Sequence, residues 1–246
     1  MSPVLTEQRD DYLVATLHRP EARNAIDTAT VDALHQLCAA LERDPQVLVL
    51  TGAGGVFAAG ADIRQLRERG PADALAGINS GLFDRIARLP LPTVAAVDGP
   101  AIGGGAELAY ACDLRLATDR AVFANPEVGL GILAAAGACW RLRDLVGLPV
   151  ATQMLLAGRR LDAAEALRLG LVAEVLPDAT ALAEAAERLV RRIAVGSAAA
   201  LRLTKLALHA PPGAHPGFDN VAQAVLFGDP EKTTRMTAFL NRKGNP

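Results

Sequence analysis

The sequence predicts an α/β fold in which buried strands alternate with amphipathic helices. Apolar runs of strand length occupy residues 12–17, 47–52 and 93–97, and each is followed by a segment with the apolar spacing of a helix. The second and third runs lack polar alternation, which is typical of strands buried on both faces of a sheet. The repeated order of strand and helix therefore indicates parallel strands joined by right-handed crossovers.

Four helices are expected in the first half of the chain, each bounded by a capping or helix-breaking residue. They are residues 28–41, capped by Asp27 or Thr28; residues 62–69; residues 72–89, closed by Pro90 and Pro92; and residues 104–112. Two short strands follow at residues 114–118 and 121–123. From Ala134 the spacing predicts mostly helix, apart from a strand over residues 171–176.

The last third of the chain is rich in alanine, leucine and charged residues, which predicts a series of helices. The expected helices are residues 180–193, 198–209, 218–227 and 231–242. The clearest break between them is Pro211-Pro212-Gly213. A helical tail after an α/β core serves either as an interface or as ordinary packing.

Composition narrows the class of protein. The chain has 246 residues, 51% of them hydrophobic, which suffices for one large domain, or for one domain with a small appendage. A net charge of −2 and an aromatic content of 4% argue against nucleic-acid binding. No uncharged apolar run approaches the roughly 20 residues of a membrane span, and the N-terminus lacks the layout of a signal peptide. Cys38, Cys112 and Cys139 are expected as free thiols in a reducing compartment, so we expect a cytoplasmic protein without a metal site.

Two glycine-rich segments carry the first chemical signal. Residues 57–63 and residues 101–108 both place small residues at a strand-to-helix turn, where backbone N–H groups can approach a ligand closely. Two such turns that face one point would form an oxyanion hole. Residues 103–108 also match a dinucleotide-binding loop in part, but they lack the glycine at the sixth position of the G-x-G-x-x-G pattern. A nicotinamide-dependent oxidoreductase is therefore the least favoured alternative.

Two carboxylates stand alone in apolar stretches beside these turns. Considered singly, Glu107 could form a salt bridge with Arg115 or face solvent, and Glu127 could be an N-terminal helix residue beside Pro126. Considered together with the two turns, the carboxylates complete a set that could stabilise an enolate and move protons. Burial and mutual repulsion would raise the pKa of at least one of them and keep it protonated near neutral pH.

Four motifs in this order resemble the crotonase superfamily, the enoyl-CoA hydratase/isomerase proteins, over most of the chain. They are residues 19–25, residues 57–63, residues 98–108 and residues 123–131. The resemblance implies an α/β fold of the ClpP/crotonase type, a spiral of repeated ββα units over residues 1–190, followed by a helical trimerisation region over residues 191–246. It also implies a homotrimer or a dimer of trimers.

The resemblance assigns roles to residues of these motifs. It implies that the backbone N–H groups of Ala61 and Gly104 bind the thioester oxygen, and that Glu107 and Glu127 are the acid–base pair. By analogy Glu107 activates the water and Glu127 exchanges the α-proton during syn addition to a trans-2-enoyl-CoA, giving a 3-hydroxyacyl-CoA. Isomerases of the family commonly keep only the equivalent of Glu127, so an enoyl-CoA hydratase is expected. A delta3-delta2-enoyl-CoA isomerase is the alternative, and a non-catalytic acyl-CoA-binding protein is a remote one.

The resemblance also implies where an acyl-CoA thioester lies, with coenzyme A as part of the substrate and no separate cofactor. The implied binding residues of the first part are Arg23, Ala25, Ala59, Gly60, Ala61, Asp62, Ile63 and Gly104. Near the C-terminus, Phe239 would approach the acyl or pantetheine channel and Arg242 the phosphates. The chain departs from the family's usual Pro-Gly-Ala-Gly-Gly-like turn, since residues 133–138 read Leu-Ala-Ala-Ala-Gly-Ala. Ala135 stands there at the position whose N–H helps to hold the water.

Overall fold

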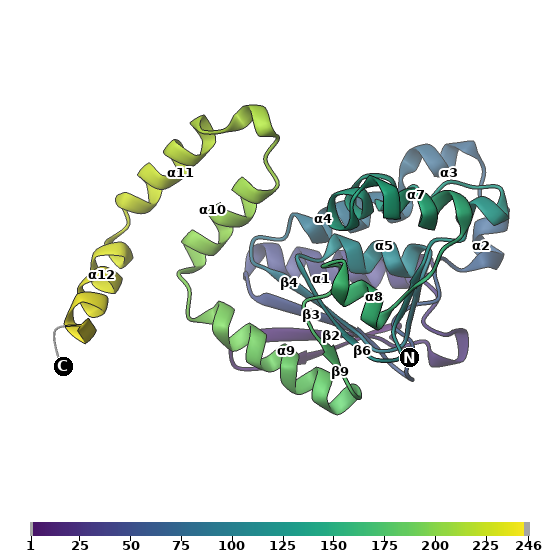
Figure 1. The fold of residues 1–246 in the computed structure, drawn as a ribbon, viewed down its shortest axis with the longest axis horizontal. Helices are drawn as coiled ribbons and strands as arrows, with labels where there is room; N and C mark the ends of the chain where they lie inside the picture. Colours follow the sequence, from purple (N-terminus) through teal and green to yellow (C-terminus); the bar gives the residue numbers. More distant parts are fainter. Residues whose placement is uncertain (1, 244–246) are drawn as a thin grey trace. The chain divides into compact units, whose positions relative to one another are not determined.

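The computed structural model describes residues 2–243, which form two compact units divided between Arg191 and Arg192 (Figure 1). All strands of the described residues lie in the first unit, and the second unit is helical. No helix in the described part of the chain is long and apolar enough to cross a membrane. The candidate site lies in the first unit, which is described first.

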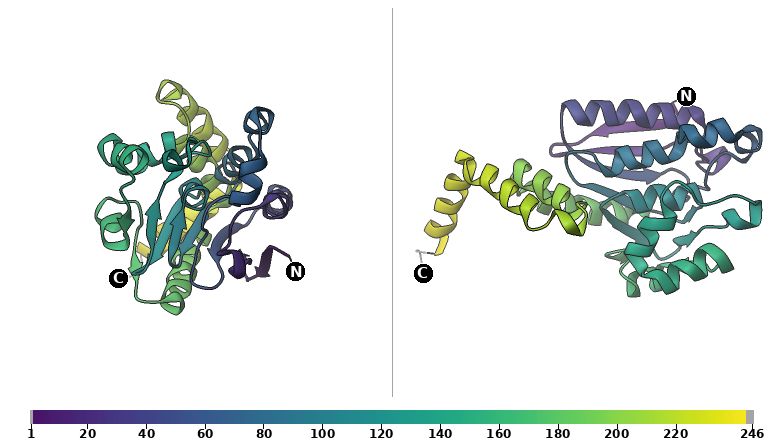
Figure 2. Two further views of the ribbon diagram at one scale, coloured as in Figure 1. Left: turned by 90° about the vertical axis from the view of Figure 1, so that its right-hand side faces the viewer. Right: turned by 90° about the horizontal axis from the view of Figure 1, so that it is seen from above.

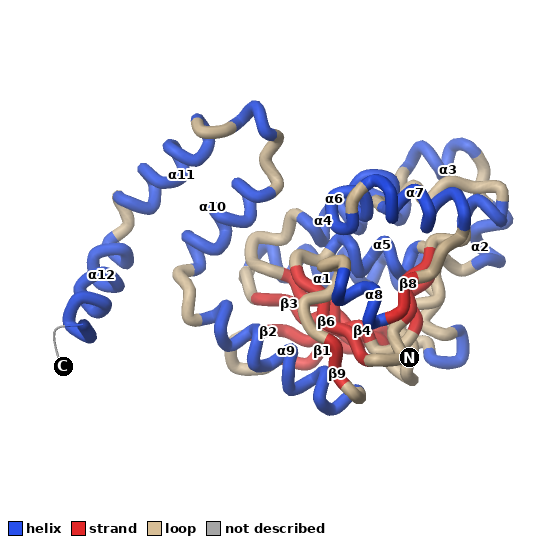
Figure 3. The backbone as a smooth tube through the Cα atoms, in the orientation of Figure 1, coloured by secondary structure: helices blue, strands red, loops and turns tan. Residues whose placement is uncertain are grey.

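The main sheet has six strands, drawn red in Figure 3 together with those of a smaller sheet. In spatial order they are β1 (Val4–Gln8), β2 (Tyr12–Leu17), β3 (Val47–Gly52), β4 (Thr93–Val97), β6 (Leu114–Thr118) and β9 (Val175–Leu176). All neighbours pair in parallel except β1 and β2, which are antiparallel. The strands predicted over residues 12–17, 47–52, 93–97 and 114–118 are confirmed.

The strand predicted over residues 171–176 is wrong in its first part, because only Val175 and Leu176 join the sheet. The amides of Leu171 and Val172 donate instead to the carbonyl oxygen of Ala166, in the turn that ends a helix. Both residues are buried in the core, so their apolar character reflects helix packing rather than strand pairing.

The helices of the first unit alternate with these strands. They are α1 (Thr28–Arg43), α2 (Ile63–Glu68), α3 (Pro71–Ala76), α4 (Ile78–Ala87), α5 (Gly104–Ala111), α6 (Arg143–Val146), α7 (Leu148–Ala157), α8 (Ala163–Arg168) and most of α9 (Ala179–Ala194). Asp27 caps α1 by accepting the N–H of Thr30 at 2.8 Å, and Asp62 caps α2. The helix starts predicted at these two aspartates are therefore confirmed.

The single helix predicted over residues 72–89 is wrong, because the segment forms two helices, α3 and α4. Gly77 separates them with a φ of +64°, in the left-handed region that glycine adopts most easily. The apolar spacing continues across this position, so periodicity alone does not reveal the break.

The main sheet is buried on both faces. Leu48 and Leu50 of β3 belong to the core that includes apolar residues of α1, α4 and α5, whereas Val49 between them is buried on the opposite face, where α9 lies (Figures 1 and 2). Successive residues of a strand point to opposite faces. A continuous apolar run is therefore buried only when both faces of its sheet are covered, as the sequence predicts.

A second, three-stranded sheet positions the candidate site. Its order is β5 (Pro100–Ile102), β7 (Val122–Ala124) and β8 (Leu161–Asp162), and β5 pairs in parallel with β7. Helix α5 starts just after β5, and a 3-10 helix over Glu127–Leu130 starts just after β7. The pairing therefore brings the chain that carries Glu107 and the chain that carries Glu127 to the same edge.

Among the described residues, the second unit contains a 3-10 helix over Pro212–Ala214 and the α-helices α10 (Ala198–Leu208), α11 (Gly217–Phe227) and α12 (Pro230–Lys243). The bounds of these α-helices agree with the predicted helices to within one residue. The hydroxyl of Ser197, at the start of α10, donates to Glu231 of α12 at 2.6 Å, and Arg235 donates to the carbonyl oxygen of Val195. These contacts connect the two ends of the unit.

Candidate active site

A cavity of about 530 Å³ in the first unit gathers both glycine-rich segments and both isolated carboxylates. Ala61, Gly104, Glu107 and Glu127 all line it, although they come from three separate parts of the sequence. The four residues predicted to carry out the chemistry therefore meet at one place.

The amide of Ala61 is left unpaired by the way its segment is bound. Ile26 N–H donates to the carbonyl oxygen of Gly60 (2.8 Å), and Asp62 N–H donates to the carbonyl oxygen of Ile26 (3.0 Å). Because successive N–H groups of an extended chain face opposite ways, this pairing turns the N–H of Ala61 away from Ile26. Since Ala61 lines the cavity, its amide is available to a ligand.

The amide of Gly104 lies beside that of Ala61. Gly104 is the first residue of α5, so its N–H has no acceptor within the helix. A Cβ placed on Gly104 would lie 3.4 Å from the nitrogen of Ala61. Within residues 2–243, neither amide donates to another protein group. Two neighbouring free amides at the positive end of a helix form a site suited to an oxyanion.

Glycines allow this close approach. Gly60 and Gly103 have φ values of +108° and +54°, where other residues are strained. A Cβ on Gly103 would lie 3.1 Å from Oε1 of Glu127. A Cβ on Gly105 would collide with the carbonyl oxygen of Ala58. Any larger residue at these positions would force the backbone or a glutamate to move.

Glu107 is buried on α5 and held by backbone amides. Only 3% of the residue is exposed, so it does not face solvent. Its Oε1 accepts hydrogen bonds from the N–H groups of Ala136 (2.8 Å) and Ala138 (3.1 Å). The alternative of a salt bridge to Arg115 is wrong, because that guanidinium donates to backbone carbonyl oxygens instead.

Burial raises the pKa of Glu107 to about 7. The N–H of Ala138 opposes this rise in pKa because it stabilises the ionised carboxylate. The negative charge of Glu127 raises the pKa of Glu107 further, whereas the N–H of Ala136 and the guanidinium of Arg141 lower it. A carboxyl group with such a pKa can gain or lose a proton near neutral pH. The rise in pKa predicted for at least one glutamate is therefore confirmed.

Glu127 is held more loosely. Glu127 follows Pro126 at the start of the 3-10 helix, which agrees with the interpretation of Glu127 as an N-terminal helix residue, and 7% of the residue is exposed. Its Oε1 accepts a long hydrogen bond from Nδ2 of Asn125 at 3.5 Å, and its Oε2 is buried with no hydrogen-bond partner among the described residues. Burial raises the pKa of Glu127 as well. A buried oxygen without a protein partner is suited to binding a ligand or a water molecule.

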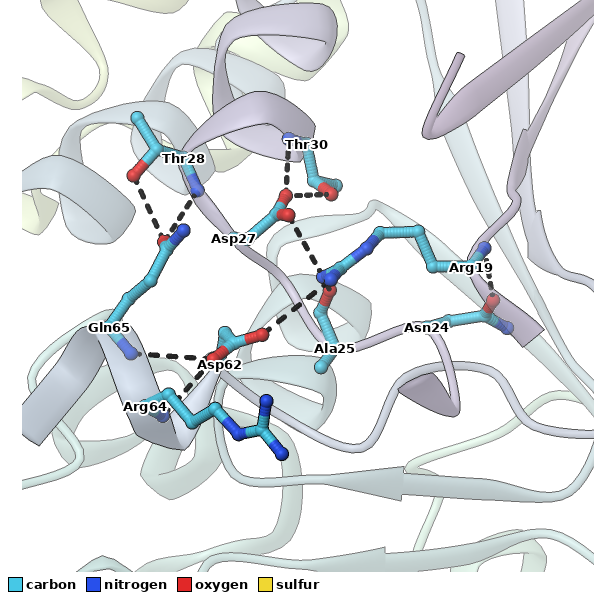
Figure 4. A network of polar contacts seen from close by, with 9 residues as sticks. All are labelled: Arg19, Asn24, Ala25, Asp27, Thr28, Thr30, Asp62, Arg64 and Gln65. Carbon is cyan, nitrogen blue, oxygen red and sulfur yellow. Dashed lines mark hydrogen bonds and ion pairs between the residues drawn. The ribbon is translucent and has the colours of Figure 1, made fainter. Parts of the chain in front are cut away.

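Arg19 joins two segments of the predicted CoA path (Figure 4). Its guanidinium donates to the carbonyl oxygen of Ala25 at 2.6 Å and forms ion pairs with Asp27 at 3.1 Å and Asp62 at 3.6 Å. The two helix-capping carboxylates, Asp27 and Asp62, and the carbonyl oxygen of Ala25 therefore all contact the guanidinium of Arg19. This network holds the predicted residues Ala25 and Asp62 near each other; their binding of CoA stays a prediction.

Other predicted residues of the first unit lie around the same cavity. Those that line it are Ala59, Gly60, Ile63 and Ala135. The carbonyl oxygen of Arg23 accepts the N–H of Ala59 at 3.0 Å, which places Arg23 next to this group. The amides that reach Glu107 are not that of Ala135 but those of Ala136 and Ala138. The predicted contact of Ala135 with a water molecule stays a prediction.

Two predicted residues lie in the second unit. Phe239 and Arg242 are both on α12. Phe239 is 57% exposed within the single chain, and the side chain of Arg242 lies outside the described residues. Their contacts with the substrate stay predictions.

Among the polar residues of the cavity wall that sequence reasoning misses are Arg69 and Asn79. Sequence reasoning predicts Arg69 only as the end of a helix, and it places Asn79 inside the segment predicted as one long helix. The break at Gly77, which places Asn79 at the start of α4, is the signal that could have drawn attention to it. Within the described residues, no group of three or more His, Cys, Asp or Glu side chains could hold a metal ion.

Known sequences are similar to this chain over most of its length. The model of a family described as enoyl-CoA hydratase/isomerase matches residues 7–242. The short-chain-enoyl-CoA hydratase of Clostridium acetobutylicum is 33% identical, over 99% of this chain and 96% of its own length. The 2,3-dehydroadipyl-CoA hydratase of Escherichia coli is 38% identical, over 85% of this chain and 82% of its own length.

Solved structures are similar in fold. The enoyl-CoA hydratase of Bacillus anthracis has a TM-score of 0.91 at 27% identity, over 98% of this chain and 96% of that chain. The enoyl-CoA hydratase of Thermoplasma volcanium has a TM-score of 0.89 at 32% identity, over 97% of each chain. The crotonase-like fold predicted from the sequence is confirmed.

Proposed function

The chain belongs to the enoyl-CoA hydratase/isomerase family, and from this premise we propose that it is an enoyl-CoA hydratase. The observation that carries the proposal is the meeting of two buried carboxylates and two free amides at one cavity. Shifting a double bond needs only one group that removes and returns a proton, whereas adding water uses both a base and an acid. Relatives named as hydratases at 33% and 38% identity support the same function.

The amides of Ala61 and Gly104 stabilise the charge that develops during the reaction. When a hydroxide adds to the β-carbon of a 2-enoyl thioester, negative charge moves onto the thioester oxygen as an enolate. Donors fixed in place before the reaction stabilise this charge more strongly than they stabilise the neutral carbonyl. The absence of side chains at Gly103 and Gly105 lets the start of α5 pack closely against Glu127 and Ala58, which keeps the two amides side by side.

The two glutamates move the protons. Glu107 takes one proton from the water, whose oxygen bonds to the β-carbon, and protonated Glu127 gives its proton to the α-carbon. The proposal places both glutamates, which line the same cavity, on one face of the double bond, so that the addition is syn. The pair holds one proton before the reaction and one after it, so no outside acid or base is consumed. Burial and mutual repulsion keep that proton on the pair near neutral pH.

The substrate of the proposal is a trans-2-enoyl-CoA, and the product is a 3-hydroxyacyl-CoA. Coenzyme A is part of the substrate, and the proposed chemistry needs no separate cofactor. The proposed CoA path runs past residues 23–25 and 59–63, which lie together in the first unit. Cys38, Cys112 and Cys139 are thiols rather than members of a disulfide, which supports a reducing compartment such as the cytoplasm.

The proposal includes assembly into a homotrimer or a dimer of trimers through the second unit. Large apolar side chains that are exposed in the single chain support it: Val221, Val225, Phe227, Met236, Phe239 and Leu240. Light scattering coupled to gel filtration should give three or six times the mass of one chain. The mass of a monomer would contradict the proposed assembly.

The function is tested by measuring hydration of crotonyl-CoA and longer 2-enoyl-CoAs beside isomerisation of a 3-enoyl-CoA. Glu107→Gln and Glu127→Gln should each lower kcat for hydration by about 10²- to 10⁴-fold, the usual contribution of a general acid or base. Glu68→Gln on the exposed face of α2 is the matched control and should retain full activity. If only Glu127→Gln matters and isomerisation dominates, the enzyme is an isomerase. Binding of acyl-CoA without either activity would instead indicate a binding protein.

A further inference from the structure

Part of the cavity wall is formed by the end of α2, by α3 and by the start of α4, and the proposed hydration uses none of these residues. Several apolar side chains line the cavity, from this wall and from the segment after β7: Leu66, Ile78, Leu130, Ile132 and Leu133. Arg69 and Asn79 are among the polar side chains that line the same cavity. A ligand that extends from the glutamates along this wall therefore meets apolar surface and a polar group.

Arg69 is a cation without an anionic partner among the described residues. Its side chain is partly buried, and its Nη1 donates to Oδ1 of Asn79 at 2.9 Å. Other partly buried arginines of the first unit are paired with carboxylates, as Arg19 is with Asp62 and Arg141 with Asp84. The more deeply buried Arg115 also lacks a carboxylate partner, but it donates to several backbone carbonyl oxygens, whereas Arg69 has only the amide oxygen of Asn79 among the described residues. Arg69 is therefore suited to an anion supplied by a ligand.

Asn79 adds a second unused donor. The guanidinium of Arg69 can only donate, so the oxygen of the Asn79 amide must face it and the nitrogen must face away. That nitrogen, Nδ2, is buried and has no hydrogen-bond partner among the described residues. Buried donors without acceptors are uncommon in folded proteins. Arg69 and Asn79 therefore form one polar unit that lacks both an anion and an acceptor.

The neighbouring polar groups do not complete this unit. Asp73 also lines the cavity, but its Oδ2 accepts the N–H of Gly70 at 2.8 Å and so caps the start of α3. The hydroxyl of Ser80 donates to the carbonyl oxygen of Gly77 at 3.3 Å. Both groups are engaged in the turns around α3, and neither is bonded to Arg69 or Asn79.

We propose that Arg69 and Asn79 bind a carboxylate at the far end of the acyl chain, so that the preferred substrates are 2-enedioyl-CoA thioesters. This proposal rests on the hydratase function proposed above. The planar guanidinium can donate to both oxygens of a carboxylate, while the apolar wall contacts the intervening methylene groups. A chain that ends in a methyl group would displace water from Arg69 without replacing its hydrogen bonds, which disfavours that substrate.

The test compares two substrates of equal carbon number, hex-2-enedioyl-CoA and hex-2-enoyl-CoA, which differ only in the terminal carboxylate. The wild-type enzyme should have the higher kcat/KM for the first. Arg69→Met should lower kcat/KM for hex-2-enedioyl-CoA by about tenfold to hundredfold, the worth of hydrogen bonds to a charged group, and leave hex-2-enoyl-CoA unchanged or improved. Arg69→Lys should fall between. Arg67→Met is the matched control, because Arg67 is exposed on the same helix and pairs with Glu68 at 2.9 Å.

Each other outcome has a separate meaning. An equal loss with both substrates would overturn the proposal, because Arg69 would then serve the CoA moiety or the fold. The absence of any preference in the wild-type enzyme would overturn it as well. If neither substrate is hydrated, the proposed function fails, and calorimetric titration with adipyl-CoA and hexanoyl-CoA decides the carboxylate site by itself. Tighter binding of adipyl-CoA that is lost in Arg69→Met and in Asn79→Leu would support the site, and equal affinities would reject it.

Discussion

Two parts of the active-site cavity wall, one on each side of Glu107 in the sequence, differ in how much space they leave for side chains. In the amide wall, which we define as residues 58–61 and 103–105, a Cβ on Gly105 would collide with the carbonyl oxygen of Ala58, and one on Gly103 would crowd Glu127. In the outer segment, defined as residues 127–138, nothing lies within 4 Å of a Cβ built on Gly129 or Gly131. The amide wall is therefore closed to a side chain at Gly103 and Gly105, whereas the outer segment is open at Gly129 and Gly131, although not at Gly137, where a Cβ would collide with the Arg141 side chain.

This difference explains why the family's glycines are matched in one wall and replaced in the other. The amide wall needs glycine because the space for a side chain is already filled by backbone or by the place of the substrate oxygen. The outer segment needs only correctly placed N–H groups, and every residue except proline has one. Ala136 and Ala138 therefore hold Glu107 in a stretch where the resemblance leads one to expect more glycine.

The largest expected effect comes from adding one methyl group to the amide wall. In Gly104→Ala the new Cβ would lie 3.4 Å from the Ala61 nitrogen, an ordinary contact that the fold can accept, yet under the proposed mechanism it would crowd the thioester oxygen between the two amides. We expect kcat/KM for hydration to fall about 10²- to 10³-fold, the usual cost of losing an oxyanion donor. The urea midpoint should change little. Full activity in this variant would show that the oxygen does not bind between the two amides.

The next effect concerns Glu107, which connects the two walls. Its pKa is raised from 4.5 to about 7, so the folded state binds its proton more tightly than the unfolded state does. The tighter proton binding stabilises the folded state fully at pH values below the pKa that Glu107 has in the unfolded chain. This stabilisation is lost as the pH rises through the pKa that Glu107 has in the folded protein. From about pH 5.5 to about pH 8 the wild-type protein should lose about 2 kcal/mol of unfolding free energy through this group.

Urea unfolding of wild type and Glu107→Gln at both pH values measures this contribution. The amide oxygen of glutamine can still accept the N–H groups of Ala136 and Ala138, but it does not titrate. The stability of the variant should therefore fall less with pH than that of wild type. Parallel pH profiles for the two proteins would show that Glu107 has an ordinary pKa in the folded state.

The contrast between the walls also separates what the sequence can reveal from what it cannot. Caps such as Asp27, and the buried apolar run at residues 47–52, depend on a few neighbouring residues, and both are predicted correctly. The glycines of the amide wall are recognisable because their constraint is steric and tied to residue identity.

Features set by the meeting of distant segments could not be predicted in this way. Gly137, with a φ of +138°, precedes the amide of Ala138 that reaches Glu107, and no side chain marks that amide as the donor. The contact of Arg69 with Asn79 requires the end of α2 to meet the start of α4, which depends on the unforeseen break before Asn79. Backbone direction and long-range pairing, rather than residue type, decide both.

A smaller effect is expected when one donor of the outer segment is removed. Ala138 is the first residue of a π-helical turn and its N–H donates to Glu107 at 3.1 Å, so Ala138→Pro removes this hydrogen bond and sets the Cδ of the ring against the carboxylate. This N–H lowers the pKa of Glu107, and its loss should therefore raise that pKa. The ionised form should be destabilised by about 1 kcal/mol, the worth of a typical hydrogen bond.

The pH profile of kcat/KM measures this change. The proposed mechanism needs one proton on the glutamate pair, so activity should fall as pH rises and that proton is lost. In Ala138→Pro the alkaline limb should move to higher pH, whereas Ala138→Gly, which keeps the amide, should retain the wild-type limb. An unmoved limb in the proline variant would mean that this amide does not control the titration of Glu107.

The smallest effect tests whether the outer segment tolerates side chains as freely as its geometry indicates. Gly129 and Gly131 both have open space where a Cβ would lie, but only Gly131 has a positive φ, of +74°. Gly129→Ala should stabilise the protein by about 0.4–1 kcal/mol through the unfolded state, and Gly131→Ala should destabilise it by about 1–2 kcal/mol. Both variants should keep their activity. If Gly129→Ala lost hydration as Gly104→Ala is expected to, the outer segment would be as tightly constrained as the amide wall, and the distinction between them would fail.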